Sequence, residues 1–439
     1  MTSEVPLLED MLVRPPLVSK YIRLPGEDRV AVQAEWHNAA GHGQEHRAPL
    51  RDVSPDASAF QSWWKSFIAG NVIPVPDSKP AKVVDLFCAS GGLSLGLETA
   101  AGWLGESVET VLAADLDEQA LEVFSSQHDP RRTFSGSVDE LVSFTVRHDR
   151  GNAFFAGEPA LTHIGNELID GPVDYVIGGP PCQGNSSLNT HTRHEDPRNR
   201  LYLTTAAFAV ACGARGLLIE NVPGVRRDRN GIVETTRSAL RSAGYKVAEG
   251  VIAADDLGWP QTRKRFFMLA LRDTNPLDIS ELASAFRQDP QPVSWLLADY
   301  LGRDPSHYLD VPSELSAANL ERIAYLDESD ELNLPDELRP DCHKDGNTYP
   351  SIYGRMDWDK PAGTITTGFS TPGRGRFIHP TEARVLTPRE AAVIQGFPED
   401  YFEMSHKPTR GDLAKWIGDA VPPILGAVAS LGLFVGGRA

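Results

Sequence analysis

Lys82-Val-Val-Asp85-Leu-Phe87-Cys88-Ala-Ser-Gly91-Gly92-Leu-Ser-Leu-Gly96 is the stretch that decides the fold of this chain. Its apolar first half predicts a short buried strand, and the small residues after Phe87 predict a tight turn into a helix. Such a turn can cradle a nucleotide cofactor, because small residues admit close backbone approach and a helix start offers free N–H groups. Asp115 ends the next apolar run, where an acidic residue suits ribose hydroxyls. The pattern predicts a Rossmann-like cofactor site, with an ordinary βαβ unit as the alternative.

A second turn presents a single thiol. The run Asp174-Tyr-Val-Ile-Gly-Gly179 leads directly into Pro180-Pro181-Cys182-Gln183. Proline fixes φ and glycine adopts conformations that other residues avoid, so this turn can hold a side chain in an unusual direction. Cys182 is therefore a candidate nucleophile. The alternative is a tight buried turn that carries an inert cysteine.

Two further segments carry charged side chains beside apolar runs. Glu220 follows Gly216-Leu-Leu-Ile219, and open α/β sheets carry their chemistry at such strand ends. A helix-capping or solvated acid is the alternative. Gln261, Arg263 and Arg265 alternate ahead of the apolar run 266–271, which predicts that they face one side, toward an anion or a base edge. The alternative there is a solvated basic strand start.

Taken together, these segments resemble the DNA (cytosine-5) methyltransferase family of bacterial type. The resemblance covers roughly residues 80–435. The matching segments, in chain order, are Asp85-Leu-Phe…Gly91-Gly92, Asp115, Gly179-Pro-Pro-Cys182-Gln, Glu220-Asn-Val, Gln261-Thr-Arg263-Lys-Arg265, Arg384-Val-Leu-Thr-Pro-Arg389-Glu390…Pro398 and Ile417-Gly418-Asp419-Ala420-Val421-Pro-Pro.

The resemblance implies a fold and a reaction. The fold would be α/β, a Rossmann-like S-adenosylmethionine-dependent methyltransferase with a mixed seven-stranded sheet flanked by helices and a smaller target-recognition domain. The reaction would transfer a methyl group from S-adenosylmethionine to carbon 5 of cytosine in a specific DNA sequence, on a base flipped out of the duplex. No metal would be needed.

The resemblance also assigns roles to individual residues. Cys182 would add to carbon 6 of the cytosine, and Glu220 would bind the ring nitrogen and the amino group. Arg263 would contact the base, with Arg265 in support. The implied cofactor contacts are Asp85, Phe87, Ser90, Gly91, Gly92, Asp115, Leu116, Pro180, Leu201, Asp419 and Ala420. The implied DNA contacts are Gln183, Ser186, Gln261 and Thr364, and the segment 183–200 would be a mobile loop that closes on DNA.

Three departures from the family pattern fall on the expected cofactor pocket. Ala89 stands where the family usually has glycine, which leaves slightly less room for the cofactor. Ser137 follows Gly136 where an aspartate often accepts from the adenine amino group, and Asp419 stands where asparagine is commoner. We therefore expect these changes to affect cofactor affinity more than methyl transfer.

Composition limits the other classes. The 439 residues, 41% of them hydrophobic, suffice for a catalytic domain and a smaller one. No membrane-spanning run or signal-peptide pattern is evident, and four cysteines without a CxxC pair suit a reducing, cytoplasmic setting. The net charge of −18 is unusual for a DNA-binding protein. Residues 273–345 hold 17 acidic and 5 basic residues, so −12 of that charge falls in one stretch, which predicts a solvated outer surface or a surface for a partner protein.

The motif positions predict the domain organisation and the partners. Residues 1–79 would be an N-terminal extension of unknown role, 80–272 the catalytic cofactor-binding domain, 273–385 the target-recognition region, and 386–439 a segment that returns to the catalytic domain. The expected partners are double-stranded DNA and a cognate restriction endonuclease or another protein, with no membrane. Two alternatives remain open at this point: an RNA (tRNA) cytosine-5 methyltransferase, and a weakly active DNA-binding or scaffolding relative.

Overall fold

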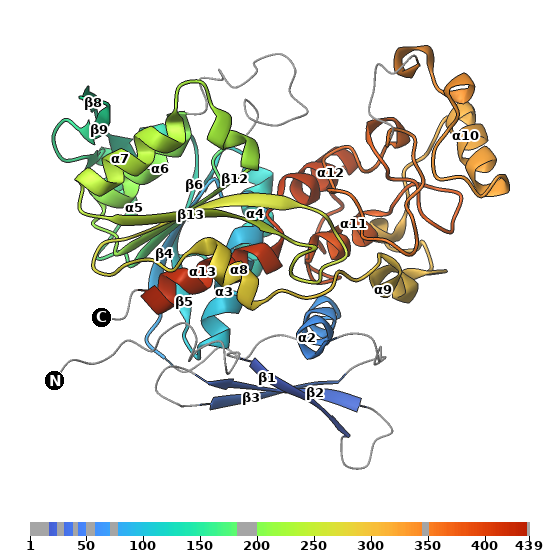
Figure 1. Ribbon diagram of the computed structural model, residues 1–439, viewed down its shortest axis with the longest axis horizontal. Helices are drawn as coiled ribbons and strands as arrows, with labels where there is room; N and C mark the ends of the chain where they lie inside the picture. The colour runs from blue at the N-terminus through green and yellow to red at the C-terminus, as the bar shows by residue number, and fades with distance from the viewer. Residues whose placement is uncertain are drawn as a thin grey trace.

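The computed structural model describes residues 17–23, 30–37, 43–49, 58–70, 78–181, 200–344 and 351–436. Within these residues, a large α/β layer carries a smaller region of loops and helices on one side and a small antiparallel sheet at its base (Figure 1).

The α/β layer is built on a seven-stranded mixed sheet. Its strands lie in the order β13-β14-β12-β11-β4-β5-β6. The bounds are β4 Ala81–Leu86, β5 Val108–Asp115, β6 Thr133–Ser135, β11 Tyr175–Gly178, β12 Gly216–Asn221, β13 Lys246–Ala253 and β14 Lys264–Leu271. Six of these strands run in one direction, and β14 runs in the opposite direction. The sheet confirms the predicted fold class.

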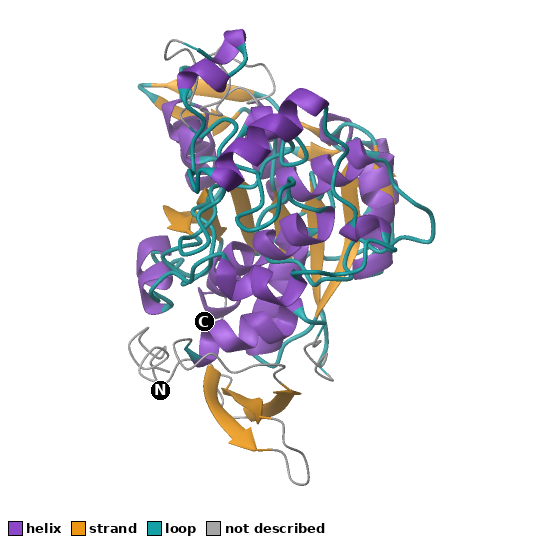
Figure 2. Ribbon diagram, turned by 90° about the vertical axis from the view of Figure 1, so that its right-hand side faces the viewer, coloured by secondary structure: helices purple, strands orange, loops and turns teal. Residues whose placement is uncertain are grey.

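Helices cover both faces of this sheet. Successive residues of one strand enter opposite cores: Ile177 packs with α3 (Gly92–Trp103), α8 (Ile279–Ala285) and α13 (Pro423–Gly436), whereas Val176 packs with α6 (Arg200–Ala211) and α7 (Ile232–Ser242). Figure 2 shows the strands enclosed between the helices. Because both faces are covered, the central strands are continuous apolar runs rather than alternating ones.

The C-terminal helix α13 returns the chain to the large layer. It packs against α3, and the two backbones approach closely at Gly96, where an added Cβ would lie 2.7 Å from the backbone of Ala427. This contact joins the last described helix to the helix that follows the first strand of the sheet.

The smaller region follows β14. It contains α9 Ser294–Leu297, α10 Ala317–Glu328, α11 Pro388–Gln395 and α12 Arg410–Asp419, and the last two share an apolar core. The helix α10 lies at the outer end of the molecule (Figure 1). Four acidic residues at its end are exposed, as expected of the acidic stretch 273–345: Asp327, Glu328, Asp330 and Glu331.

The N-terminal part lies below the large layer in Figure 1. Strands β1 (Leu17–Arg23), β2 (Val30–His37) and β3 (Gly43–Pro49) form an antiparallel sheet, and the helix α2 (Ala59–Ile68) follows. Trp63 and Trp64 of α2 are buried against Trp103, at ring-centroid distances of 5.6 and 5.9 Å. Aromatic burial of this size anchors α2 to the large layer.

Further short helices and strands lie between these elements. They are α4 Glu118–His128, α5 His163–Leu168, β7 Val142–Ser143, β8 Val146–Asp149, β9 Asn152–Phe155 and β10 Ala160–Leu161. In the described ranges, no single helix has the length and apolarity to cross a membrane. The bent pair α12–α13 meets that test by length and composition only.

Candidate active site

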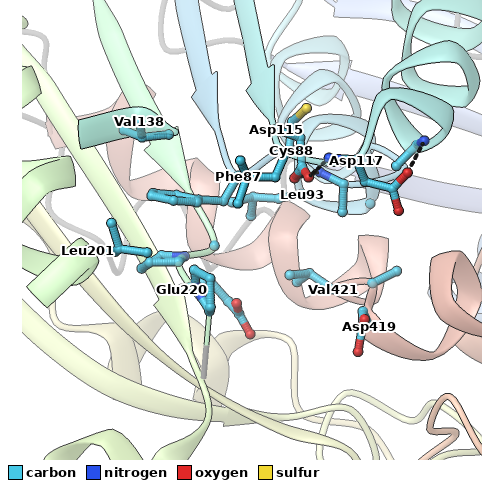
Figure 3. A pocket seen from close by; sticks show the side chains of 18 of the residues that line it. Phe87, Cys88, Leu93, Asp115, Asp117, Val138, Leu201, Glu220, Asp419 and Val421 are labelled. Carbon is cyan, nitrogen blue, oxygen red and sulfur yellow. Dashed lines mark hydrogen bonds between the residues drawn. The ribbon is translucent and has the colours of Figure 1, made fainter. Parts of the chain in front are cut away.

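A cavity of about 750 Å³ opens at the carboxyl ends of the central strands (Figure 3). Phe87 follows β4, Asp115 ends β5, Gly179 and Pro180 follow β11, and Glu220 lies in β12. Parallel strands that end at one edge bring together residues that are far apart in sequence. Further lining residues come from the turn into α3, from the start of α4, from the segment 136–139, from the start of α6, and from α12 with the residues after it.

The turn after β4 has an unusual backbone. Phe87, Ala89 and Gly91 have φ values of 59°, 45° and 92°. Only glycine adopts this left-handed region at little cost, so the alanine at position 89 is strained, and the family's usual glycine would not be. The departure at Ala89 therefore acts on the backbone of the turn as well as on the room beside it.

Asp115 holds this turn in place. One of its carboxylate oxygens accepts from the backbone N–H of Ala89 at 2.9 Å, and the other accepts from that of Asp117 at 2.9 Å. Burial raises the pKa of Asp115 in spite of these bonds. Asp117 pairs in turn with Lys415 of α12, which closes one side of the cavity.

A hydrogen-bonded chain lies directly beneath the turn. Glu98 contacts His128 Nδ1 at 2.7 Å, and His128 Nε2 lies 2.8 Å from the hydroxyl of Tyr401. That hydroxyl donates to the carbonyl of Ser90 at 2.7 Å. A Cβ at Gly91 would lie 2.6 Å from the same hydroxyl, so this position requires glycine for space as well as for φ.

The opposite side of the cavity carries a buried acid beside an arginine. Glu220 Oε1 lies 2.7 Å from Arg265 Nε, and the two side chains are 8% and 12% exposed. Burial raises the pKa of Glu220, although Arg265 and Arg263 act in the other direction. Burial also raises the pKa of Asp419, on the wall formed by α12. Clustered carboxyl groups with raised pKa values are typical of functional sites.

Cys88 is the other cysteine to be considered, because it also lines the cavity. Burial, together with the charges of Asp85 and Asp115, raises its pKa well above the usual thiol value. The side chain therefore stays a neutral thiol, which is a poor nucleophile.

The structure corrects the expectations for two residues near β14. Arg263 is 2% exposed, and its guanidinium donates to the carbonyls of Ile365, Gly418 and Ala420 at 2.5, 3.0 and 2.8 Å. It therefore ties the segment before β14 to Ile365 and to the C-terminal end of α12, both in the smaller region, while Arg265 is the arginine beside Glu220. Gln261 is fully buried and donates to the carbonyl of Ile394 at 2.9 Å, so it presents no surface to DNA. Strand alternation could not reveal this, because both residues precede β14 and lie beneath segments from later in the chain.

The expected cofactor residues divide into two groups. Those that line the cavity are Phe87, Gly92, Asp115, Leu116, Pro180, Leu201, Asp419 and Ala420. Asp85, Ser90 and Gly91 lie behind it: Asp85 is 1% exposed and accepts from the Ser94 hydroxyl at 2.7 Å, and the Ser90 hydroxyl donates to the carbonyl of Trp416 at 3.0 Å. Thr364 is half-buried outside the cavity lining. Cys182, Gln183 and Ser186 lie outside the described residues.

Sequence reasoning missed several residues of the lining. Asp117, Arg200, Lys415, Trp416 and Val421 all line the cavity. Asp117 and Arg200 adjoin expected positions, so a wider window around each motif would have found them. Lys415 gives no such signal, because its partner Asp117 is 298 residues away.

Known proteins share this fold and the sequence segments that form this site. The model of the C-5 cytosine-specific DNA methylase family matches residues 81–429. The chain belongs to this family. The family of this chain thus acts on carbon 5 of cytosine in DNA, as the motifs predicted, and this supports the DNA interpretation over the RNA alternative.

Two relatives show the extent of the similarity. The chain is 36% identical to the Type II methyltransferase M1.BsuMI of Bacillus subtilis over 80% of this chain and 79% of that protein. It is 29% identical to the Type II methylase M.HgiDII of Herpetosiphon aurantiacus over 79% of this chain and 93% of that protein. The crystal structure of the S. pombe Dnmt2 methyltransferase superposes with a TM-score of 0.55 at 18% identity, over 81% of this chain and 98% of that one, which supports the fold.

Proposed function

We propose that this methylase binds S-adenosylmethionine in the cavity and methylates a flipped-out cytosine of a specific DNA sequence through a covalent adduct of Cys182. The observation that carries the proposal is the pair of Glu220 and Arg265 at one side of a cavity whose opposite side is bounded by Asp115 and Asp117. Glu220 and Arg265 can bind the polar edge of a cytosine, and Asp115 and Asp117 can bind the cofactor.

The residues present fit the cofactor. S-adenosylmethionine carries a sulfonium and an ammonium group, and Asp115, Asp117 and Asp419 give its cavity an acidic wall. Asp115 suits ribose hydroxyls, while Phe87, Leu116 and Leu201 supply apolar surface for the adenine. Gly92 lets the segment after α12 pack closely against the start of α3, since an added Cβ would collide with the carbonyl oxygen of Val421. When bound, the cofactor supplies an electrophilic methyl group.

The protein's own residues activate the cytosine. The thiolate of Cys182 adds to carbon 6, which places electron density on carbon 5. Glu220 promotes this addition, because its raised pKa lets the carboxyl share a proton with the ring nitrogen, which draws electrons away from carbon 6. Arg265 holds the carboxyl in place. After the methyl group is accepted at carbon 5, loss of the carbon 5 proton expels the thiolate and restores the aromatic ring.

The chain order supports the choice of Cys182. It directly follows Pro181, which lines the cavity, whereas Cys88 is kept neutral by its surroundings. We further propose the domain roles set out from the sequence, a cytoplasmic location, and, from the names of the Type II relatives, a cognate restriction endonuclease on a separate chain.

Trapping on modified DNA tests the proposal. A duplex containing 5-fluorocytosine cannot lose a proton from carbon 5, so the wild-type protein should remain covalently joined to it in the presence of cofactor. Cys182→Ala should form no adduct, and Cys88→Ala is the matched control that should form it. Base-resolution sequencing of methylated genomic DNA should then show a defined set of cytosines. An adduct with the Cys182→Ala variant, or none with the wild type on a duplex carrying many sequences, would reject the proposed nucleophile.

A further inference from the structure

Two exposed arginines follow the strand that carries Glu220. The short 3-10 helix η3 spans Pro223–Arg227 and begins directly after β12. Its residues Arg226 and Arg227 are exposed, and neither forms an ion pair within the described part of the chain. Some exposed arginines of the described chain are paired, as Arg131 is with Glu109 and Arg287 with Asp256, whereas Arg147 and Arg150 of the β8–β9 hairpin have no ion pair among the described residues. Arg226 and Arg227 differ from that second pair in their place, because they follow the strand that ends at the cavity.

The local structure fixes where these arginines lie. Val222, one residue before η3, lines the cavity. The guanidinium of Arg226 lies 6.0 Å from the ring centroid of Phe266, which pairs with Asn221 across β12 and β14 and is next to Arg265. Arg226 therefore covers the start of β14 on the face that packs against α6 and α7, one residue along the strand from Arg265. Contact with an aromatic ring also restrains the planar guanidinium before a ligand binds.

The acid next to these arginines faces inward. Asp228 is 8% exposed, and its carboxylate accepts from the backbone N–H groups of Asn230 and Ile232 at 3.0 and 3.3 Å. These bonds order the turn into α7. The loop is thus rigid at its acidic residue and presents Arg226 and Arg227 to solvent.

We propose that Arg226 and Arg227 bind backbone phosphates of the DNA strand that carries the target cytosine. This inference rests on the proposed function. A base that enters the cavity toward Glu220 draws its own flanking phosphates to the cavity rim, where these cations lie. Guanidinium groups bind phosphate through paired N–H donors, and such contacts position DNA without reading its sequence. Arg226 and Arg227 therefore hold the flipped strand in register with Glu220.

Salt dependence of DNA binding tests this directly. The double variant Arg226→Gln/Arg227→Gln is compared with Arg147→Gln/Arg150→Gln, which removes the same charge from the β8–β9 hairpin at the far end of the sheet (Figure 1). Binding of a fluorescent duplex is measured by anisotropy between about 50 and 200 mM salt. Each lost phosphate contact lowers the slope of log K against log salt by about 0.9. The first variant should therefore lose about 1.8 from the slope, so its deficit relative to wild type shrinks roughly tenfold over this range.

Further variants and measurements distinguish failure of the phosphate contacts from failure of the proposed function. Arg226→Lys/Arg227→Lys should retain the wild-type slope, because the charges remain. Binding of S-adenosylhomocysteine should be unchanged in all the variants. If the Gln variant of η3 keeps the wild-type slope or matches the hairpin control, the phosphate contacts are refuted. If the wild-type protein itself neither binds nor methylates DNA, the proposed function fails instead.

Discussion

Two glycines of the helix α12 should respond in opposite ways to the same substitution. An added Cβ at Gly418 would collide with backbone atoms of Thr366 and Thr367, and would lie 2.6 Å from Thr367 Cα. At Gly411 the nearest atom is the Thr409 hydroxyl, at 3.7 Å. Both residues belong to α12, so helix propensity favours alanine at each position, by up to about 1 kcal/mol.

The magnitude follows from these distances. Ordinary carbon contacts are about 3.5 Å, so Gly418→Ala must move the segment 366–367 away from α12 by roughly 1 Å. The obstacle is backbone, which cannot rotate aside, so the overpacking cost should reach about 3 kcal/mol. After the gain in propensity, we expect Gly418→Ala to lower the free energy of unfolding by about 2 kcal/mol, while Gly411→Ala raises it by up to about 1 kcal/mol.

Equilibrium unfolding in urea, followed by tryptophan fluorescence, measures both variants. Gly418 also precedes Asp419 and Ala420 in the cavity wall, and its carbonyl accepts from Arg263. Gly418→Ala should therefore weaken S-adenosylhomocysteine binding by calorimetry, whereas Gly411→Ala should leave it unchanged. Equal shifts of the unfolding midpoint in the two variants, or a Gly418→Ala protein as stable as wild type, would show that the contact of α12 with residues 366–367 is misplaced.

Three further substitutions test the cofactor turn. Asp115→Asn replaces one acceptor oxygen by a donor that faces a backbone N–H. An unsatisfied group costs about 1–3 kcal/mol, so cofactor affinity should fall at least about fivefold. An unchanged Kd for S-adenosylhomocysteine would contradict this role. Tyr401→Phe removes the hydroxyl that donates to the Ser90 carbonyl. It should lower the free energy of unfolding by about 1–3 kcal/mol in thermal unfolding and weaken cofactor binding. An unchanged stability would show that this hydrogen bond does not hold the turn. Burial raises the pKa of Asp85 from 3.8 to about 7. Between these two values the native chain therefore keeps a proton on Asp85 that the unfolded chain releases. The stability contributed by the protonated carboxyl group is complete at low pH and is lost as pH rises through about 7. Asp85→Asn should therefore gain stability relative to wild type between about pH 4 and pH 7, and a difference that does not vary with pH would show that Asp85 is ionised throughout.

The residues themselves were sufficient for four neighbouring strands of the sheet and for one edge of the site. The apolar runs before Phe87, Asp115, Gly179 and Glu220 are strands β4, β5, β11 and β12, and their polar ends meet at the cavity. This could be predicted because parallel strands in one sheet place their carboxyl ends at the same edge. The fold class and the family followed from the same motifs.

The sequence was less informative about which side chains face the cavity. Asp85, Ser90 and Gly91 belong to the predicted cofactor motif, but they support the turn from behind. The hydroxyl that holds this turn comes from Tyr401, more than 300 residues along the chain from Ser90. A local pattern identifies a turn, but it does not show which of its faces a distant segment will cover.

The two arginines of the segment 261–265 show which properties of a residue follow from the sequence and which depend on the tertiary structure. The sequence by itself determined a basic, alternating stretch ahead of a buried strand, together with the family to which it belongs. Only the tertiary structure decided that Arg263 is buried against the carbonyls of Ile365, Gly418 and Ala420, while Arg265 lies beside Glu220. The physical reason is that strand direction and alternation follow from neighbouring residues, whereas burial depends on which later segments fold back over them.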